Sequence, residues 1–145
     1  MRKETIMNTF NLKIMACDRV FYDGQCQMLV FPSADGSMGI MANHESMTTS
    51  VEIGELRFKT PDGKEHVAIT SDGILKCDHN QVDILVYSCE RPEEIDEFRA
   101  KEAKERAMEQ MRQKQSIMEY HISRASLARA MARLSGRDKY VGGNR

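Results

Sequence analysis

Three arginines and an aspartate stand at spacings that would bring their side chains together on paired helices. Asp96 and Arg99 are three residues apart, and Arg129 and Arg133 are four apart, so each pair would share one face of a helix. If the two segments fold back on each other, three guanidinium groups converge near Asp96 and Glu90. Arginine forks match phosphate oxygens, and the carboxylate could accept from a base amino group or hold an arginine. The alternative is a set of ion pairs along each helix, without a ligand.

Signatures of catalysis are absent from the sequence. It has no GxxxxGK[ST] loop, no GxSxG and no HExxH motif. The four histidines are scattered, and the four cysteines form neither a CxxC pair nor a zinc spacing. We therefore expect no enzyme active site and no metal site, and we expect free thiols in a reducing, cytosol-facing compartment. No apolar run is long enough to span a bilayer.

Charge is distributed unevenly along a chain whose net charge is only −1. Residues 1–91 hold 9 Lys and Arg against 13 Asp and Glu, whereas residues 92–145 hold 12 against 9. From Arg112 onward, eight basic residues face only two acidic ones, Glu119 and Asp138. The near-neutral total gives no nucleic-acid or membrane signal. The basic end could dock on an acidic protein surface, or it could simply match a helix dipole on a solvated face.

The first part of the chain is predicted to form short strands. Apolar and polar residues alternate at 10–16 and 55–59, and further strands are expected at 27–31, 66–70, 74–77 and 82–87. Turns are predicted at Asp23-Gly24, which follows 20–22, at Pro61-Asp62-Gly63, and at His79-Asn80. Many short strands at close spacing indicate an antiparallel sandwich or barrel.

The period changes at Pro92, and no glycine or further proline occurs before Ser135. Pro92 suits the first turn of a helix, and the acidic residues after it suit the positive end of the helix dipole. Gly136 predicts a helix end. Two stripes follow a helical period, the first Ala100, Ala103, Ala107 and Met111, the second Ile117, Tyr120, Arg124, Leu127, Met131 and Leu134.

The join between the stripes, residues 113–116, contains no strong helix breaker. Two arrangements are therefore open. A folded-back hairpin would bury the alanine stripe against the second helix, whereas a nearly continuous helix would need partners for both stripes. The sequence leaves the two arrangements close in free energy, and a conformational switch requires two such arrangements. The sequence thus predicts an α+β protein with a β module at 1–91 and a helical unit at 92–145.

Several motifs in a fixed order resemble the epsilon subunit of bacterial F-type ATP synthases, over almost the whole chain. In order, they are a Gly-x-x-Gly-Ile step and an Asn-His pair within residues 31–44, residues 51–57 and 71–77, an Ile-Asp-x-x-Arg-Ala motif at 95–100, and an arginine-bearing segment at 128–134. The resemblance implies an antiparallel β-sandwich of about ten strands followed by a two-helix hairpin. It also implies a non-catalytic rotor subunit of the central stalk.

The resemblance further implies partners and a location. The sandwich would dock between the gamma subunit and the c-ring, coupling proton flow to rotation, on the cytoplasmic side of the cell membrane and peripheral to it. The helical arm would switch between a folded form and an extended form that reaches the catalytic alpha/beta subunits and restrains ATP hydrolysis. No cofactor would be required, and ATP would be a regulatory ligand of the folded arm.

Carried over residue by residue, the resemblance implies two sites. The ATP site would comprise Glu90, Ile95, Asp96, Arg99, Ala100, Arg129 and Arg133. Contact with gamma and the c-ring would involve Ser37, Met38 and His44.

Three positions depart from the family's pattern. The family often has an acid at the position of Ser37, which weakens the expectation of a specific c-ring contact there. Glu45-Ser46 stands where the family usually has Ala-Pro, so we expect a less rigid loop. Asp72 replaces a glycine, and aspartate tolerates left-handed backbone better than most residues. A different class of function also stays open: a free-standing cytosolic regulator whose basic arm docks on an acidic partner.

Overall fold

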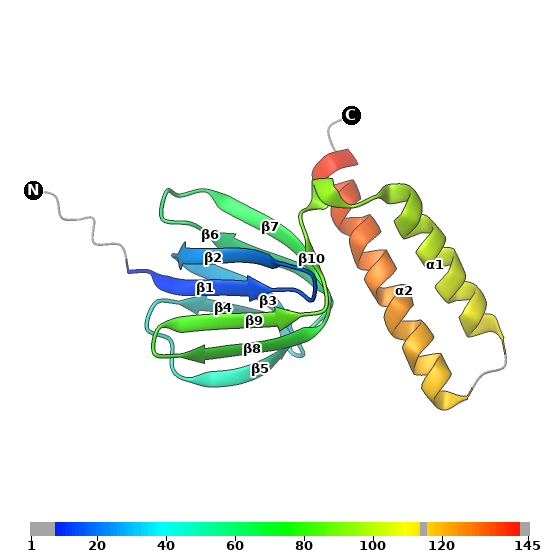
Figure 1. The fold of residues 1–145 in the computed structure, drawn as a ribbon, viewed down its shortest axis with the longest axis horizontal. Helices are drawn as coiled ribbons and strands as arrows, with labels where there is room; N and C mark the ends of the chain where they lie inside the picture. The colour runs from blue at the N-terminus through cyan, green and yellow to red at the C-terminus, as the bar shows by residue number, and fades with distance from the viewer. Residues whose placement is uncertain (1–7, 114–115, 143–145) are drawn as a thin grey trace, which may run out of the picture. The chain divides into compact units, whose positions relative to one another are not determined.

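The computed structural model describes residues 8–113 and 116–142. Contacts divide the chain into two compact units, Met1–Glu90 and Arg91–Arg145. The described part of the first unit contains ten strands in two sheets, and that of the second contains two α-helices lying side by side (Figure 1). The predicted fold class, an α+β protein with a β-sandwich followed by a two-helix hairpin, is confirmed.

The first sheet has the strand order β2-β1-β9-β8-β5. Its strands are β1 (Phe10–Met15), β2 (Val20–Cys26), β5 (Met47–Val51), β8 (Gly73–Asp78) and β9 (Gln81–Val86). Neighbouring strands pair antiparallel except β1 and β9, which run parallel from Asn11 opposite Gln81 to Met15 opposite Leu85. The N-terminal strand therefore lies inside the sheet, next to a strand that forms near the end of the unit.

The second sheet has the order β10-β7-β6-β3-β4. Its strands are β3 (Met28–Ser33), β4 (Gly36–Met41), β6 (Gly54–Lys59), β7 (Glu65–Thr70) and β10 (Cys89–Glu90). One face of each sheet supplies the core, because alternate residues of a strand point to opposite faces. The largest buried side chains include Phe10, Leu12, Ile14, Leu29, Phe31, Ile40, Leu56, Leu75 and Ile84. This apolar set explains why the first unit holds together without a disulfide.

Two predicted turns are confirmed and one is wrong. Gly63 has φ +85°, and His79 and Asn80 have φ 48° and 59°, so both turns use the left-handed region. Asp23 and Gly24 instead lie inside β2, opposite Lys13 and Leu12. The turn before that strand forms earlier, where the N–H of Ala16 donates to the carbonyl of Arg19 at 2.8 Å. The ring of Tyr22 covers Gly24, which explains a glycine in mid-strand.

Gly73 opens β8 where two strands approach closely. A Cβ atom built there would stand 2.1 Å from the carbonyl oxygen of Leu85 and 2.8 Å from the Cα of Val86. No other side chain fits without moving the backbone. Asp72, the preceding residue, is not among the described residues with positive φ. Aspartate in place of the family's glycine therefore does not have to adopt the left-handed conformation there.

The helical unit begins differently from the sequence expectation. Pro92 belongs to a separate 3₁₀ turn, η1 (Pro92–Glu94), and α1 (Glu97–Arg112) starts only after Asp96. Pro92 therefore stands in the first turn of a helix, as predicted, but that helix is a separate 3₁₀ turn and not α1. Ile95 has extended backbone, which breaks the path between the turn and the helix. A second helix, α2 (Ile117–Arg137), follows, and a π-helical turn, η2 (Asp138–Gly142), extends it past Gly136. The predicted end at Gly136 is thus wrong.

The seam between α1 and α2 is built from small side chains. Ala100 and Ala107 of the first predicted stripe are buried, as are Ser123 and Ala130 of α2. The second predicted stripe has the wrong phase, because Ile117 and Met131 in it are exposed. Small residues allow the two helices to approach closely, and the larger hydrophobic residues of α2 consequently point elsewhere. Residues 114 and 115 of the join lie outside the described residues.

Within the described residues, no helix is both long and apolar enough to cross a membrane. The four cysteines are free thiols, as predicted: Cys17 is exposed, and Cys26, Cys77 and Cys89 are buried. Burial raises the pKa of the Cys26 and Cys77 thiols, which keeps both neutral and poorly reactive.

The close approach at Gly73 generates a stability prediction. We expect Gly73→Ala to lower the free energy of unfolding by about 1–3 kcal/mol, because the added methyl group overlaps the backbone of β9. Urea unfolding followed by circular dichroism measures the change. Gly39→Ala is the matched control, since its Cβ would lie 3.8 Å from the nearest atom, the carbonyl oxygen of Leu29. Equal midpoints for the two variants would contradict the prediction.

Candidate ligand site and docking face

Asp96 fixes the start of α1. Its backbone is extended, and its side-chain Oδ1 accepts a hydrogen bond from the N–H of Arg99 at 3.1 Å. The same carboxylate lies 3.8 Å from the guanidinium Nε of Arg99, at an exposed position. Aspartate is a favoured N-cap because it satisfies a backbone donor that the helix leaves free. Of its two predicted roles, Asp96 therefore holds the arginine in this structure, while also capping the helix.

Two contacts fix the register between the helices. The Nε of Arg137 lies 3.5 Å from Oε2 of Glu97, and Oγ of Ser123 donates to Oε1 of Gln110 at 3.4 Å. In an antiparallel pair, the numbers of two facing residues add to a constant, because one number rises as the other falls. The two pairs here add to 234 and 233, so the helices run antiparallel in a single register. Arg133 lies level with residue 100 or 101 of α1 by the same count.

The three arginines share one face of the hairpin. Successive helical residues turn by about 100°, so Arg99 stands about 100° from the buried Ala100. Arg133 and Arg129 stand about 60° and 100° from the buried Ala130, in the same sense of rotation. In an antiparallel pair, the same sense leads to the same face. At a rise of 1.5 Å per residue, Arg133 lies about 2–3 Å along the axis from Arg99, and Arg129 about 8–9 Å.

The other residues of the predicted ligand site are placed as follows. Ile95 and Ala100 are buried and support the start of α1. Arg129 donates from Nη2 to Oγ of Ser126 at 3.1 Å, which holds its side chain along α2. Glu90 belongs to β10 of the sandwich, opposite Ile69 of β7. Its place in a ligand site stays a prediction.

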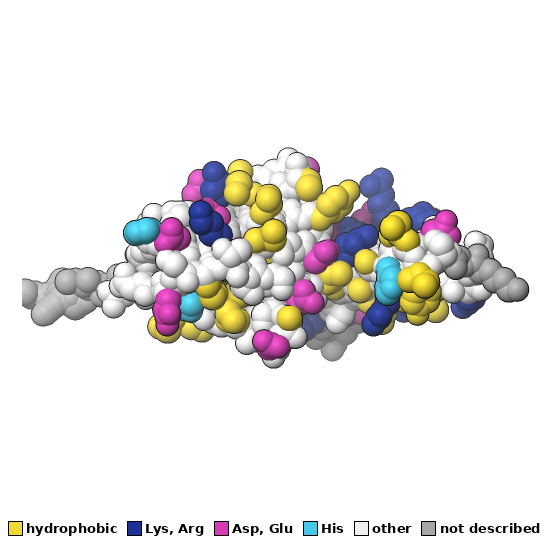
Figure 2. All heavy atoms as spheres, turned by 90° about the horizontal axis from the view of Figure 1, so that it is seen from below, with side chains coloured by type: hydrophobic (Ala, Val, Ile, Leu, Met, Phe, Trp, Pro, Cys, Tyr) yellow, Lys and Arg dark blue, Asp and Glu magenta, His cyan; other side chains and the backbone are white. Residues whose placement is uncertain are grey.

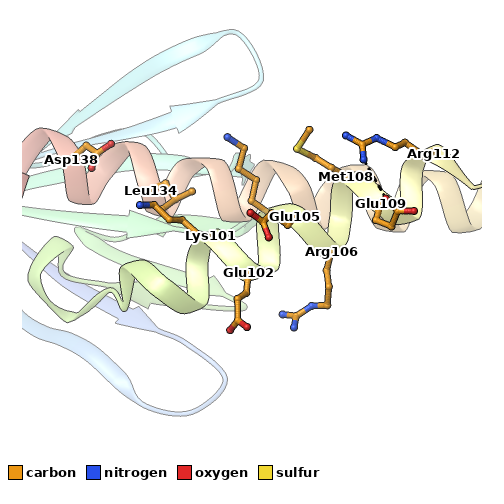
Figure 3. Close-up of a pocket in the computed structure, with 10 residues that line it drawn as sticks. Lys101, Glu102, Glu105, Arg106, Met108, Glu109, Arg112, Leu134 and Asp138 are labelled. Atoms are coloured by element: carbon orange, nitrogen blue, oxygen red, sulfur yellow. Dashed lines mark hydrogen bonds and ion pairs between the residues drawn. The ribbon is translucent and has the colours of Figure 1, made fainter.

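The opposite face of the hairpin carries an open groove of about 1000 Å³. Lys101, Glu105 and Met108 of α1 and Leu134 of α2 line it, together with Asp138 (Figure 3). Lys101 is turned from Ala100 in the sense opposite to Arg99, so the groove and the arginines lie on different faces. None of the three arginines lines the groove. With basic and acidic groups in near balance, its charge does not select an anion.

The three predicted contact residues of the sandwich lie in and after β4, an edge strand. Ser37 is exposed and opposite Pro32, whereas Met38 is half-buried against the core. His44 is half-buried in the following loop, where its Nδ1 lies 2.8 Å from the carbonyl oxygen of Glu45. Their role in contacting gamma and the c-ring stays a prediction.

The loop after His44 is tied to the turn between β8 and β9. Oγ of Ser46 donates to Oδ1 of Asp78 at 2.6 Å, and the N–H of Asn43 donates to Oδ1 of Asn80 at 2.8 Å. The Ser46 hydrogen bond, followed by that of His79, lowers the pKa of the Asp78 carboxyl. Proline at position 46 could not make this bond, so the serine compensates for the rigidity that proline would have supplied.

A row of apolar side chains crosses the outer face of the first sheet, which sequence reasoning missed. The register places Val20 opposite Met15, Met15 opposite Leu85, and Leu85 opposite Ile74, on four adjacent strands. Val20, Leu85 and Ile74 are each more than half exposed. A bulge in the β1–β2 ladder turns Val20 to this face. We call these four residues the apolar row.

The neighbouring row of the same face alternates in charge. Asp23 lies opposite Lys13, Lys13 opposite Asp83, and Asp83 opposite Lys76. Opposite charges in register stabilise a sheet, and they also mark a surface with a fixed orientation for a partner. An exposed apolar row beside ordered charges is typical of a protein interaction surface. Both rows become visible only in the strand register, because the register places residues side by side that are far apart in the sequence.

Two family models cover this architecture. The model described as ATP synthase, Delta/Epsilon chain, beta-sandwich domain matches residues 9–92, and ATP synthase, Delta/Epsilon chain, long alpha-helix domain matches residues 93–135. The sandwich and the hairpin together define the class, a delta/epsilon-type chain of a rotary ATP synthase. The chain belongs to the ATP synthase delta/epsilon chain family. It is a non-catalytic subunit of that enzyme, and the family and the names of its relatives give no support to the alternative of a free-standing regulator.

Curated relatives agree with the family models. A protein of Ruminiclostridium cellulolyticum named ATP synthase epsilon chain is 42% identical over 133 residues, covering 92% of this chain and 98% of its own. One of Caldicellulosiruptor bescii with the same name is 42% identical over 128 residues, covering 88% of this chain and 93% of its own. The resemblance inferred from the sequence motifs is thereby confirmed.

Solved structures show the same fold at low identity. A chain in the Euglena gracilis mitochondrial ATP synthase, solved with OSCP, F1 and c-ring, has a TM-score of 0.72 and 20% identity, covering 91% of this chain and 83% of that one. A chain in the central stalk and c-ring of the Tetrahymena thermophila enzyme has a TM-score of 0.62 and 8% identity, covering 88% and 95%. At these identities the likeness is one of fold.

Proposed function

We propose that the sandwich docks on the gamma subunit through the apolar row, and that the hairpin is a regulatory arm whose folded form binds ATP. The partners of this central-stalk subunit are gamma, the c-ring and the catalytic alpha/beta subunits. Assembly with them would hold the chain at the cytoplasmic side of the cell membrane, as a peripheral component. The subunit would couple c-ring rotation to ATP synthesis without doing chemistry itself.

The observation that carries the ATP site is the alignment of Arg99 and Arg133 on one face. The two differ in level by about 2–3 Å along the helix axis, and Arg129 follows about one turn further on. Like charges gathered on one face favour an anion between them, and guanidinium forks match phosphate. Asp96 orients Arg99 toward this face through its cap. Because the alignment exists only in the hairpin, ATP would stabilise the folded arm and disfavour any other form.

The proposed docking face predicts the effect of a buried charge at the interface. We expect Leu85→Asp to weaken assembly with gamma at least tenfold, because a carboxylate would be desolvated against an apolar partner. Leu85 is more than half exposed, so the sandwich should keep its thermal midpoint. Co-purification with gamma measures assembly. Thr48→Asp, an exposed position on the same face next to Lys76, is the control and should assemble normally. Equal recovery of gamma with both variants would refute the docking face.

The proposed arm predicts the effect of removing it. A chain ending at Arg91 should fold, because the first unit has its own core, and should still assemble with gamma. ATP hydrolysis by the assembled complex should rise, since the arm can no longer restrain the catalytic subunits. Steady-state hydrolysis with full-length and truncated chains measures the difference. Equal rates would show that this arm is not inhibitory.

The proposed ligand site predicts graded effects on ATP binding. Arg99→Ala or Arg133→Ala should each cost about 1.5–3 kcal/mol of binding free energy, the scale of a charged hydrogen bond. Lysine at either position should recover only part, because an ammonium lacks the fork. Calorimetric titration of the isolated chain with ATP, with and without Mg²⁺, measures the affinity.

Arg124→Ala supplies the control for these variants. Arg124 is exposed on α2 and turned about 120° from Ala130 in the sense opposite to Arg133. Its replacement should leave ATP affinity unchanged. An unchanged affinity in the Arg129→Ala, Arg133→Ala double variant would falsify the site even if ATP binds elsewhere.

A further inference from the structure

The break between α1 and α2 is held by a reciprocal pair of hydrogen bonds. Oγ of Ser116 accepts from the N–H of Glu119 at 3.2 Å, and Oε2 of Glu119 accepts from the N–H of Ser116 at 3.1 Å. This capping box satisfies two of the four backbone donors that the start of a helix leaves free. Gln113 and Ser116 both have extended backbone, with ψ 154° and 161°, so α1 has ended before the box begins.

Both hydrogen bonds of the box exist only while the helix is interrupted. If α1 continued into α2, the N–H of Ser116 would donate to the carbonyl of Arg112, four residues earlier. The N–H of Glu119 would likewise donate to the carbonyl four residues before it. Neither donor would be free for a side chain. The capping box therefore stabilises the hairpin and contributes nothing to a continuous helix.

The hairpin also leaves large hydrophobic side chains uncovered next to the box. Ile117, Met118 and Ile122 are 80%, 73% and 61% exposed. Hydrophobic side chains of the helical unit lie on the surface shown in Figure 2. A form of the arm that buried these side chains against a partner would gain the free energy of removing their apolar surface from water, which the hairpin does not gain. The hairpin thus depends on contacts specific to itself, and the capping box supplies two of them.

We propose that the Ser116–Glu119 capping box is the latch that sets the balance between the folded and the extended arm. This inference rests on the proposed function, which supplies the extended form. A contact shifts a two-state equilibrium only by the difference between the free energies that it contributes to the two states. The capping box stabilises the folded arm alone, so its whole free energy acts on the equilibrium. Loss of an N-cap serine typically changes such an equilibrium by about 2- to 30-fold. Alanine acts further in the same direction, because it favours a helix more than serine does.

The test compares four variants in the assembled complex. Ser116→Ala and Glu119→Ala remove the box, whereas Ser116→Asp and Glu119→Gln preserve a capping side chain. Ser135→Ala is the matched control, because it makes the same chemical change at an exposed position inside α2. All variants carry Cys17→Ser, which removes the exposed native thiol and leaves three buried ones.

The readout is the distance between spin labels on Glu102→Cys and Met131→Cys, measured by pulsed electron resonance. The two positions are level in the hairpin register, about one interhelical spacing of 8–10 Å apart at the backbone. In a continuous helix they would be about 44 Å apart. We expect the ratio of long to short distances to rise by 2- to 30-fold or more in Ser116→Ala and Glu119→Ala. The two conservative variants and Ser135→Ala should match the parent.

ATP hydrolysis separates the latch from the inhibitory function. If the extended arm is inhibitory, Ser116→Ala should lower hydrolysis, opposite in sign to deletion of the arm. A shift in distances without a change in hydrolysis would uphold the latch and overturn inhibition. Unchanged distances in Ser116→Ala, when arm deletion does raise hydrolysis, would overturn the latch alone. If the short distance disappears and the helical circular dichroism signal disappears with it, the latch would also be overturned, because the arm would then have unfolded.

Discussion

The helical unit depends on a seam too narrow to hold it firmly. Alanines and a serine form the buried line between α1 and α2, so each residue removes little apolar surface from water compared with a leucine. Register then rests on polar contacts at the ends, Arg137 with Glu97 and Ser123 with Gln110. Exposed ion pairs and single hydrogen bonds are each worth about 1 kcal/mol or less. A hairpin built this way can exchange with another form at modest cost, which suits a regulatory arm.

The sandwich is built by the opposite rule. Large side chains from both sheets fill one core, and alternate positions face outward in ordered rows. The rigid unit presents a fixed pattern of apolar and charged rows, whereas the helical unit presents groups that come into line only in one form. The packing of each unit therefore suits its proposed role: the rigid sandwich suits docking, and the weakly packed hairpin suits switching.

Sequence patterns predicted the elements whose signal is local. Alternation at Phe58 and its neighbours, the Pro61–Gly63 turn and the alanine stripe all arise within a few residues, and all are confirmed. Failures arose where tertiary packing outweighed a local preference. Asp23-Gly24 resembles a turn, yet β1 pairs with it as a strand. Ser116 and Glu119 carried a recognisable capping signature that would have marked the start of α2. The apolar row was beyond prediction, because only the strand register brings Val20 and Ile74 into one line.

The parallel pairing of β1 with β9 has a consequence for how the chain is made. The inner edge of β1 finds its partner only when Gln81–Val86 has been synthesised. Each paired residue of β9 comes 70 residues after its partner in β1, as 81 − 11 for Asn11 opposite Gln81 and 85 − 15 for Met15 opposite Leu85. At roughly 5–20 residues per second, that edge waits several seconds during translation. Phe10, Leu12 and Ile14 stay without a complete core over the same interval. Non-local closure of this kind also slows folding, so we expect the sandwich to fold more slowly than the helical unit, whose contacts are more local.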